Sequence, residues 1–131
     1  MTMVDGAKLK GGALAVLRKR SDFLACARAR RQGTSGMMVQ ARQRRDDEPA
    51  EAPIRVGFTC SKKVGNAVAR NRAKRRLREV ARLVLPEAGM AGYDYVLIGR
   101  HGATAERDFE ALKGDLRYAL GKLHALQGGQ E

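Results

Sequence analysis

The sequence predicts a small α+β domain, a single-domain sandwich in which helices pack on a three- to four-stranded, mainly antiparallel sheet. Three observations predict this class. Residues 37–42 and 54–60 alternate between apolar and polar side chains, as half-buried strands do. Residues 69–84 and 109–123 carry apolar side chains every three or four positions, as helices with one buried face do. The 131 residues suffice for one modest core.

The chain divides into one domain and two short tails. Residues 1–12 are dotted with glycine and weakly patterned, which predicts a flexible N-terminal tail. Residues 13–127 form the predicted domain. Residues 128–131, Gly-Gly-Gln-Glu, form a C-terminal tail that we expect to fray.

The domain is predicted to begin with a helix and a turn. The helix candidate runs from Leu14 to Arg30, and Ser21 and Asp22 are good N-caps for the part that begins at Phe23. The cluster of Gln, Gly, Thr, Ser and Gly at 32–36 is typical of a turn.

Two strands joined by a polar loop come next. Residues 37–42 form the first strand and residues 54–60 the second. Between them, residues 43–53 carry both signs of charge and are bounded by proline. This composition predicts a solvated hairpin loop, because the flanking strands are too short to stand alone.

A basic helix follows the second strand. The loop at 61–65 leads into it, and proline and glycine at 86–92 end it. Its apolar stripe consists of Ala69, Ala73, Leu77, Val80 and Val84.

A strand and a last helix complete the domain. Residues 93–99 are continuously apolar from Tyr95 to Ile98, which predicts burial on both faces at the centre of the sheet. The last helix runs from about Asp108, an N-cap candidate, to Leu126. Its inward stripe consists of Phe109, Leu112, Leu116, Ala119 and Leu123.

The charge balance predicts a polyanionic partner. Lysine and arginine number 26 and aspartate and glutamate 14, a net charge of +12. Such an excess on one small domain is typical of nucleic-acid binding. No apolar run is long enough for a signal peptide or a membrane span, so we expect a cytoplasmic protein that does not bind membranes. Cys26 and Cys60 have no metal-ligand spacing and are expected to be small buried hydrophobes.

The basic residues concentrate on one helix. Residues 62–82 hold nine basic side chains and a single acid, Glu79. Like charges at helical spacing repel one another, so this arrangement gains from a bound polyanion. Arginine outnumbers lysine six to one over residues 70–82, which suits forked donation to phosphate oxygens. The alternative is a solvated charged face, but such faces normally mix both signs.

The junction between strand and helix admits two interpretations. Gly65 and Asn66 form either an ordinary turn with Asn66 as N-cap, or a turn whose backbone N–H groups also hold a phosphate. No catalytic constellation is present. Glu79 stands among arginines, His101 and His124 are far apart, and the acids at 46–48 lack partner ligands, so we expect no catalytic residue and no metal site.

The residues around the basic helix resemble a known signature. The run FTCSKKVGNAVARNRAKRRLRE at 58–79 closely resembles that of the bacterial ribonuclease P protein component, including its Arg-Asn-Arg motif at 70–72. The resemblance extends to 20–23, to 93–96 and to the last helix, and so covers most of the chain.

The resemblance implies a fold and a function. The fold is the ribosomal protein S5 domain 2-like type, with a left-handed βαβ crossover, an exception to the usual hand. The protein binds a catalytic RNA and precursor tRNA, and the complex removes the 5′ leader with Mg²⁺ held mainly by the RNA. Catalysis is carried by the RNA, the protein alone is inactive, and no DNA partner is expected.

Two sets of binding residues follow from the resemblance. The set expected to face the catalytic RNA is Lys62, Lys63, Arg70, Asn71, Arg72, Lys74, Arg75 and Arg78. The set expected to contact the 5′ leader is Phe23, Met38, Gln40 and Phe58. Ala27 and Gln40 stand where many family members have aromatic residues, so leader contacts here are expected to rest more on charge than on stacking.

The alternative function is that of a ribosomal or other structural RNA-binding protein with no role in cleavage. A DNA-binding architectural protein is a third class, but the sequence has no helix-turn-helix pattern and no minor-groove arm. The Ser-Lys-Lys-Val-Gly-Asn-Ala run at 61–67 before the Arg-Asn-Arg motif separates the first two, because generic ribosomal basic tracts do not carry it.

Overall fold

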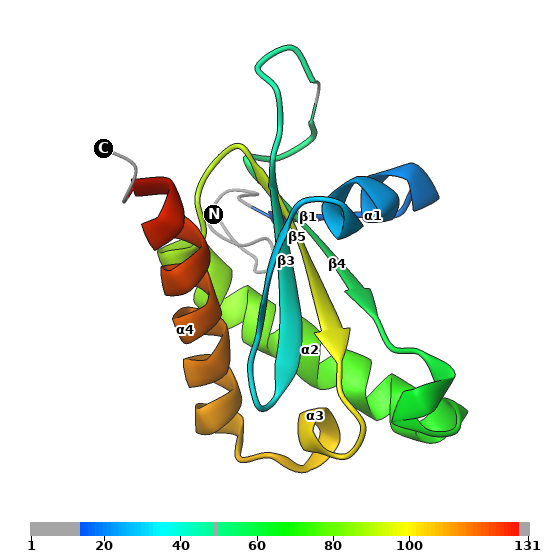
Figure 1. Ribbon diagram of the computed structural model, residues 1–131. Coiled ribbons are helices and arrows are strands. Elements are labelled where there is room, and N and C mark those ends of the chain that lie inside the picture. Colours follow the sequence, from blue (N-terminus) through cyan, green and yellow to red (C-terminus); the bar gives the residue numbers. More distant parts are fainter. Residues whose placement is uncertain (1–13, 49, 129–131) are drawn as a thin grey trace, which may run out of the picture.

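The computed structural model describes residues 14–48 and 50–128. Along the chain the elements are β1 Leu14–Val16, α1 Arg20–Ala27, β2 Arg30–Gly33, β3 Met37–Gln43, β4 Ile54–Thr59, the 3₁₀ helix η1 Lys62–Val64, α2 Ala67–Ala88, β5 Tyr93–Gly99, α3 Ala103–Glu106 and α4 Phe109–Gly128. Figure 1 shows α2 behind the sheet, α4 at its left and α1 at its upper right.

The strands form one mixed sheet in the order β1-β4-β5-β3-β2. The central strand, β5, runs parallel to β4 and antiparallel to β3. The chain passes from β4 through α2 to β5, so a long helix connects two neighbouring parallel strands. The burial predicted for Tyr95 to Ile98 is confirmed for Tyr95, Val96 and Leu97, whereas Ile98 is half-buried.

The main core lies between the sheet and two helices. Strand residues of one face, among them Met37 and Tyr95, pack against Leu77 of α2 and Leu116 of α4, and all four are fully buried. The predicted stripes lie in this core from Leu77 on α2 and from Leu112 on α4, and the half-buried Phe109 packs against it. Ala73 is buried outside this cluster, and Ala69 is half-buried. Asp108 Oδ2 accepts a hydrogen bond from the Ala111 N–H at 3.1 Å, so the predicted cap of α4 is confirmed.

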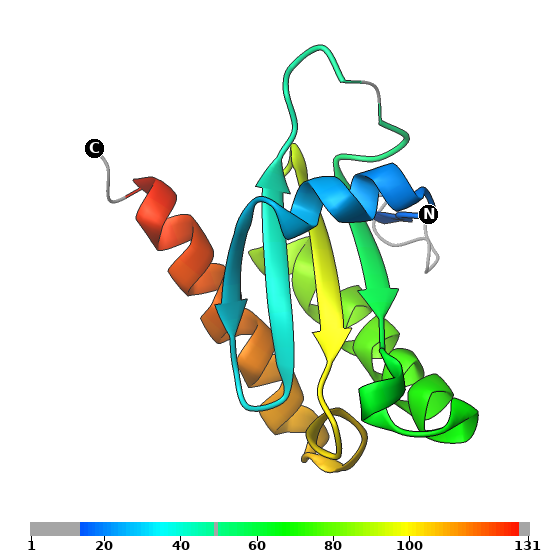
Figure 2. The ribbon, with the colours of Figure 1, turned by 45° about the vertical axis from the view of Figure 1, so that its right-hand side comes forward.

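A smaller core lies on the opposite face of the sheet. There α1 crosses one end of the strands (Figure 2) and buries Cys26 against Leu17 and Val96, with Phe23 and Ile98 partly buried beside them. Because α1 is only eight residues long, the other end of this face has no covering helix among residues 14–48 and 50–128.

The α+β class is confirmed, but the sheet has five strands in the described residues rather than three or four. The additional strands are the two edge strands. β2 reads Arg-Arg-Gln-Gly and carries no apolar alternation, because an edge strand can stay polar. A tight turn brings it onto β3, where the Thr34 N–H and Oγ1 both donate to the Met37 carbonyl, at 2.9 and 2.7 Å.

The helix predicted over residues 14–30 was wrong in its first part and at its end, because α1 stops at Ala27 and Arg30 begins β2. Residues 14–16 run parallel to β4, and the Leu17 N–H donates to the Val56 carbonyl at 2.9 Å, so this segment extends the sheet. α1 begins at Arg20 after Lys19, whose side chain makes no capping bond. The predicted caps Ser21 and Asp22 therefore lie inside the first turn.

The segment from 43 to 53 is not a hairpin loop, as the sequence had suggested. β3 and β4 are separated by β5 in the sheet, so this connection crosses the end of the central strand. It projects beyond the sheet in Figures 1 and 2. Alternation within each strand does not reveal which strand is its neighbour, and β5 comes later in the chain.

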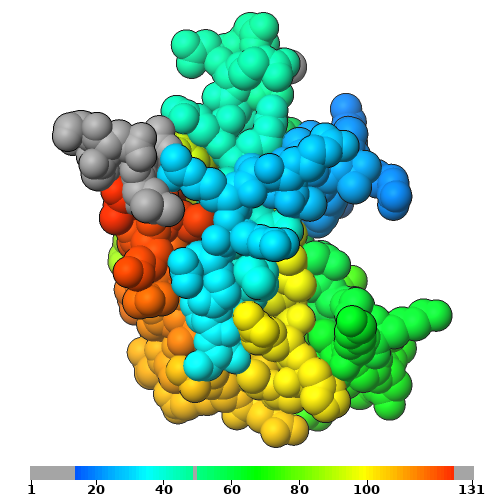
Figure 3. All heavy atoms as spheres, in the orientation of Figure 1, coloured from blue at the N-terminus to red at the C-terminus, as the bar shows by residue number. Residues whose placement is uncertain are grey.

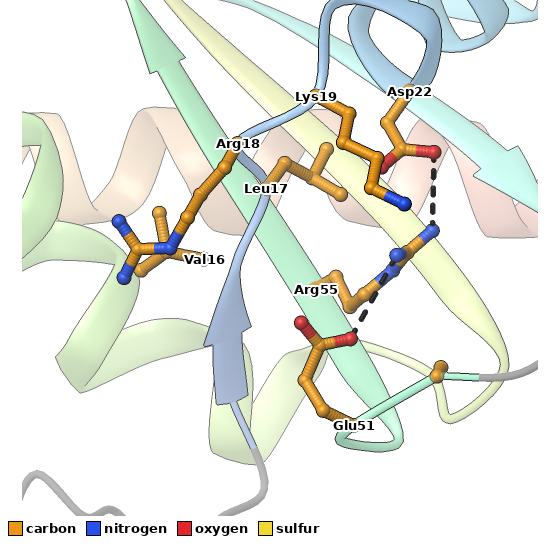
Figure 4. Close-up of a pocket in the computed structure, with 8 residues that line it drawn as sticks. Val16, Leu17, Arg18, Lys19, Asp22, Glu51 and Arg55 are labelled. Atoms are coloured by element: carbon orange, nitrogen blue, oxygen red, sulfur yellow. Dashed lines mark ion pairs between the residues drawn. The ribbon is translucent and has the colours of Figure 1, made fainter.

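A buried carboxylate holds this end of the sheet together. Asp94 on β5 is fully buried and accepts hydrogen bonds from Arg44 Nη1 at 2.6 Å and from Arg55 Nη2 at 2.7 Å. The hydrogen bond between Arg55 and Asp94 raises the pKa of the Arg55 guanidinium above its ordinary value. Arg55 also lies 3.6 Å from Asp22 and 3.8 Å from Glu51 (Figure 4). The cluster thus joins β4, β5, α1 and the connection that follows β3.

Candidate nucleic-acid interface

The loop before α2 has a fixed backbone. Gly65 has a φ of 143°, in the region that favours glycine, and lets the chain turn from η1 into α2. Asn66 Oδ1 accepts a hydrogen bond from the Ala69 N–H at 2.9 Å, so the predicted N-cap is confirmed. Arg70 Nη1 donates to the Gly65 carbonyl at 3.0 Å and ties the loop to the helix. The phosphate suggested for this turn stays a prediction.

His101 braces the same loop from the other side. Its Nδ1 lies 3.1 Å from the Lys63 carbonyl and 3.3 Å from that of Val64, so it carries the proton that these oxygens accept. The contact joins η1 to the turn after β5, and thereby to the central strand. Lys62 and Lys63 are exposed on η1. The Lys63 backbone is held by Ser61 Oγ at its N–H and by His101 at its carbonyl.

The residues predicted to face the catalytic RNA gather on one surface, here called the α2 basic face. Lys62, Lys63, Asn71, Arg72, Arg75 and Arg78 are exposed, and Arg70 and Lys74 are half-buried at its edge. The segment from η1 into α2 projects from the body of the molecule at the lower right of Figure 3. A surface that stands out in this way can lie against a large partner.

The charges of this face are not balanced by nearby acids. Among the ion pairs of the described residues, none includes Arg70, Arg72, Arg75 or any lysine of this face. Glu79 pairs with Arg82 instead, and that contact lowers the pKa of its carboxyl. Closely spaced arginines without local counter-charges are suited to the phosphates of a nucleic acid.

Arg76 is an arginine of α2 with a structural role. Its Nη1 donates to the carbonyls of Thr104 at 3.0 Å and Arg107 at 2.7 Å, and its guanidinium lies over the Phe109 ring. These bonds hold α3 and the start of α4 against α2. The side chain points away from the α2 basic face, to which the sequence analysis had not assigned it.

The four residues predicted to contact the leader do not lie on one face. Phe23, Met38 and Gln40 lie on the face that α1 crosses. Phe58 pairs with Leu97 and packs on the opposite face, with the main core. Strand alternation explains this, because it is Gly57, the residue before Phe58, that faces Phe23. The structure therefore separates Phe58 from the other three.

The uncovered part of the α1 side forms a second surface, here called the open face. Its floor is made by the half-buried Met38 and Ile98, which are paired neighbours on β3 and β5. Gln40 is only 8% exposed and lies deeper, and Phe23 borders the floor at α1. The face combines an apolar floor with the polar edge strand β2.

Two arginines of the open face were not among the predicted site residues. Arg31 pairs with Gln40 and is exposed, and Arg100 follows β5 and is also exposed. A Cβ at Gly33 would lie 2.8 Å from Arg100 Nη2, so this side chain reaches across β3 to β2. The alternation through residues 96, 98 and 100 was the signal that could have placed Arg100 on this face.

Burial raises the thiol pKa of both cysteines. Cys26 is fully buried, and burial raises the pKa of its thiol to about 12. Cys60 is half-buried, and burial raises its thiol pKa as well, against the opposing effect of Lys74 and Arg70. Both are free thiols. Burial confirms the prediction for Cys26 and bears it out in part for Cys60.

Neither a membrane span nor a metal cluster is found in the described part of the chain. No helix there has the length and hydropathy needed to cross a membrane. Residues 14–48 and 50–128 contain no group of three or more histidine, cysteine, aspartate or glutamate side chains that could hold a metal ion.

Comparisons with known proteins identify the family. The model of the family described as Ribonuclease P matches residues 13–124. The chain is 72% identical over 112 residues to the ribonuclease P protein component of Ruegeria pomeroyi, covering 86% of this chain and 88% of that protein. It is 51% identical over 109 residues to that of Caulobacter vibrioides, covering 83% and 70%.

Solved structures show the same architecture. The RNase P protein of Staphylococcus aureus is 25% identical and superposes with a TM-score of 0.65, over 82% of this chain and 94% of that one. The RNase P protein of Thermotoga maritima is 28% identical with a TM-score of 0.60, over 78% and 91%.

Proposed function

The chain belongs to the ribonuclease P protein family, and from that premise we propose that its two surfaces hold two RNAs. The α2 basic face binds the catalytic RNA, and the open face binds the 5′ leader of precursor tRNA. The observation that carries the proposal is the crowding of exposed arginines and lysines on the α2 basic face, whose basic side chains form no ion pair with a described residue.

The α2 basic face suits a folded RNA. Arg72 and Arg75 are exposed on a helix that the main core holds from Leu77 onward, and Lys62 and Lys63 extend the surface on η1. Guanidinium groups bind phosphate oxygens in pairs, which selects for backbone geometry as well as charge. Binding of this kind requires no base sequence.

The open face suits a single strand. An apolar floor with few aromatic groups offers limited stacking, and Arg31 and Arg100 provide charge at its border. Single strands bind where cations follow the backbone and flat or apolar groups contact the bases. The small stacking area favours binding that is tolerant of leader sequence.

The protein contributes binding rather than chemistry. The described residues hold no cluster suited to a metal ion, and no carboxylate or histidine of the α2 basic face is placed for acid–base work. Mg²⁺ is held mainly by the RNA, where it supplies charge stabilisation for phosphodiester hydrolysis. By covering phosphates, the protein lowers the Mg²⁺ concentration that the complex needs.

The test is cleavage of precursor tRNA by a bacterial ribonuclease P RNA at low Mg²⁺, with and without this protein. We expect the protein to restore accurate cleavage at the 5′ end of the mature sequence, because it offsets repulsion between phosphates. RNA binding without any gain in cleavage would contradict the proposal.

Replacing Arg100 by alanine is expected to weaken binding of precursor tRNA to the holoenzyme about fivefold while leaving mature tRNA unaffected. One phosphate contact contributes a salt slope of about 0.7 on a single strand, which corresponds to this factor at about 0.1 M salt. Affinities of both tRNAs measured side by side check the prediction, with Lys122→Ala on α4 as the charge-matched control. An equal loss for both tRNAs would remove Arg100 from the leader surface.

A further inference from the structure

We infer that a groove beside Phe58 receives one unstacked base of the catalytic RNA. The inference rests on the proposed function, because it adds a base contact to a surface assigned so far to phosphates. The groove lies between α2 and the edge of the sheet formed by β1 and β4. It is lined by Leu14, Val16, Val56, Phe58, Arg78 and Ala81, with Arg82 beside them.

The groove exists because the sheet extends sideways beyond α2, the helix that covers this face. β1 lies outside β4 at the edge of the sheet, and Val16 faces the same side as Val56. Val56 is buried under α2, whereas Val16 is 44% exposed. An apolar strip therefore remains at this edge, next to the half-buried ring of Phe58.

Flat groups line the groove. The Arg78 guanidinium carbon lies 5.7 Å from the centroid of the Phe58 ring, so the cation sits over the aromatic ring. Aromatic rings and guanidinium planes are the two protein groups on which unpaired RNA bases stack. The cavity volume of about 190 Å³ is below the roughly 300 to 1,000 Å³ of pockets for drug-sized ligands. This size suits a single base.

Charge and position select RNA over other apolar occupants. Arg78 belongs both to the groove and to the α2 basic face, and Lys74 precedes it by one helical turn. An apolar protein segment gains nothing from these cations, whereas a base brings its own phosphate to them. The groove is continuous with the surface proposed for the catalytic RNA. The base of an unpaired nucleotide there would contact the apolar strip, and its phosphate would contact the cations.

The test compares Phe58→Leu with Phe58→Trp in the full chain, using a bacterial ribonuclease P RNA as the probe. Leucine keeps the apolar volume but loses the flat ring, and the expected loss of affinity is about 5- to 150-fold with an unchanged salt slope. Tryptophan keeps a stacking surface and is expected to retain affinity. Because the chain contains no tryptophan, Phe58→Trp also provides a single fluorophore, whose emission a stacked base should quench.

The control is Tyr118→Trp, at a tyrosine that is 54% exposed on α4, whose emission should stay constant when the RNA binds. Native affinity of Phe58→Leu together with unquenched emission of Phe58→Trp would overturn the inference. Removal of the α2 cations would still weaken binding in that case, so the proposed function would survive. A further measurement deletes residues 2–12 from Phe58→Trp and records its emission without RNA. A shift in emission would also overturn the inference, because it would mean that the groove is occupied by the N-terminal residues of the chain.

Discussion

Replacing Asp94 by asparagine is expected to lower the free energy of unfolding by about 3 to 5 kcal/mol, the usual cost of breaking a buried ion pair from one side. The carboxylate is fully buried and accepts hydrogen bonds from Arg44 and Arg55, with Arg42 3.6 Å away. The substitution leaves these guanidiniums around a neutral amide, whose NH₂ group is itself a donor. Urea unfolding followed by circular dichroism measures the effect.

The matched control is Asp47→Asn. The Asp47 side chain is 82% exposed and pairs with Arg45 at 3.4 Å, so its loss should change stability by no more than about 0.5 kcal/mol. A similarly small effect at Asp94 would mean that the arginines are held by other contacts. Arg44 is the obvious candidate, since it also donates to the carbonyls of Tyr93 at 3.0 Å and Pro53 at 2.8 Å.

Replacing Arg72 and Arg75 together by alanine is expected to weaken binding of the catalytic RNA about 30-fold at 0.15 M salt. Each phosphate contact on duplex nucleic acid contributes about 0.9 to the slope of log K against log salt, so the slope should fall by about 1.8. Both side chains are exposed and make no ion pair with a described residue, so the fold should be unaffected. Titrations at several salt concentrations give affinity and slope together.

The double variant Arg117→Ala/Lys122→Ala is the matched control. It removes the same number of charges from exposed positions on α4, and its slope should stay close to the native one. If both double variants lowered the slope equally, the RNA would be bound by the positive charge of the whole protein rather than by one surface. The α2 basic face would then have no special role.

The sequence predicted the elements of the core well, because burial leaves a periodic pattern. The stripe from Ala73 to Val84 and the apolar run in β5 both lie where the pattern indicated. The cap at Asn66 was predictable for a similar reason, since it depends on residues three positions apart. Local interactions of this kind are fully contained in a short window of sequence.

The edge strands and the grouping of Phe58 depended on neighbours distant in the chain. β1 is a strand because it pairs with the edge of β4, and β2 is a strand because it pairs with β3. Alternation placed Phe58 opposite Gly57 within the strand, but it did not reveal which face α1 would cross. Arg100 could have been placed on the open face by alternation along β5, but its reach toward β2 depends on a strand at the edge of the sheet.

Gly57 and Phe58 occupy consecutive positions on β4 and back the two proposed RNA surfaces from opposite sides. A Cβ at Gly57 would lie 2.5 Å from the Phe23 ring, so α1 is seated directly on the strand, while Phe58 supports Arg78 on the far side. Because a single peptide bond connects the two positions, neither surface shifts without the other. The thickness of the sheet therefore sets the distance between the surface proposed for the leader and the surface proposed for the catalytic RNA, before either RNA binds.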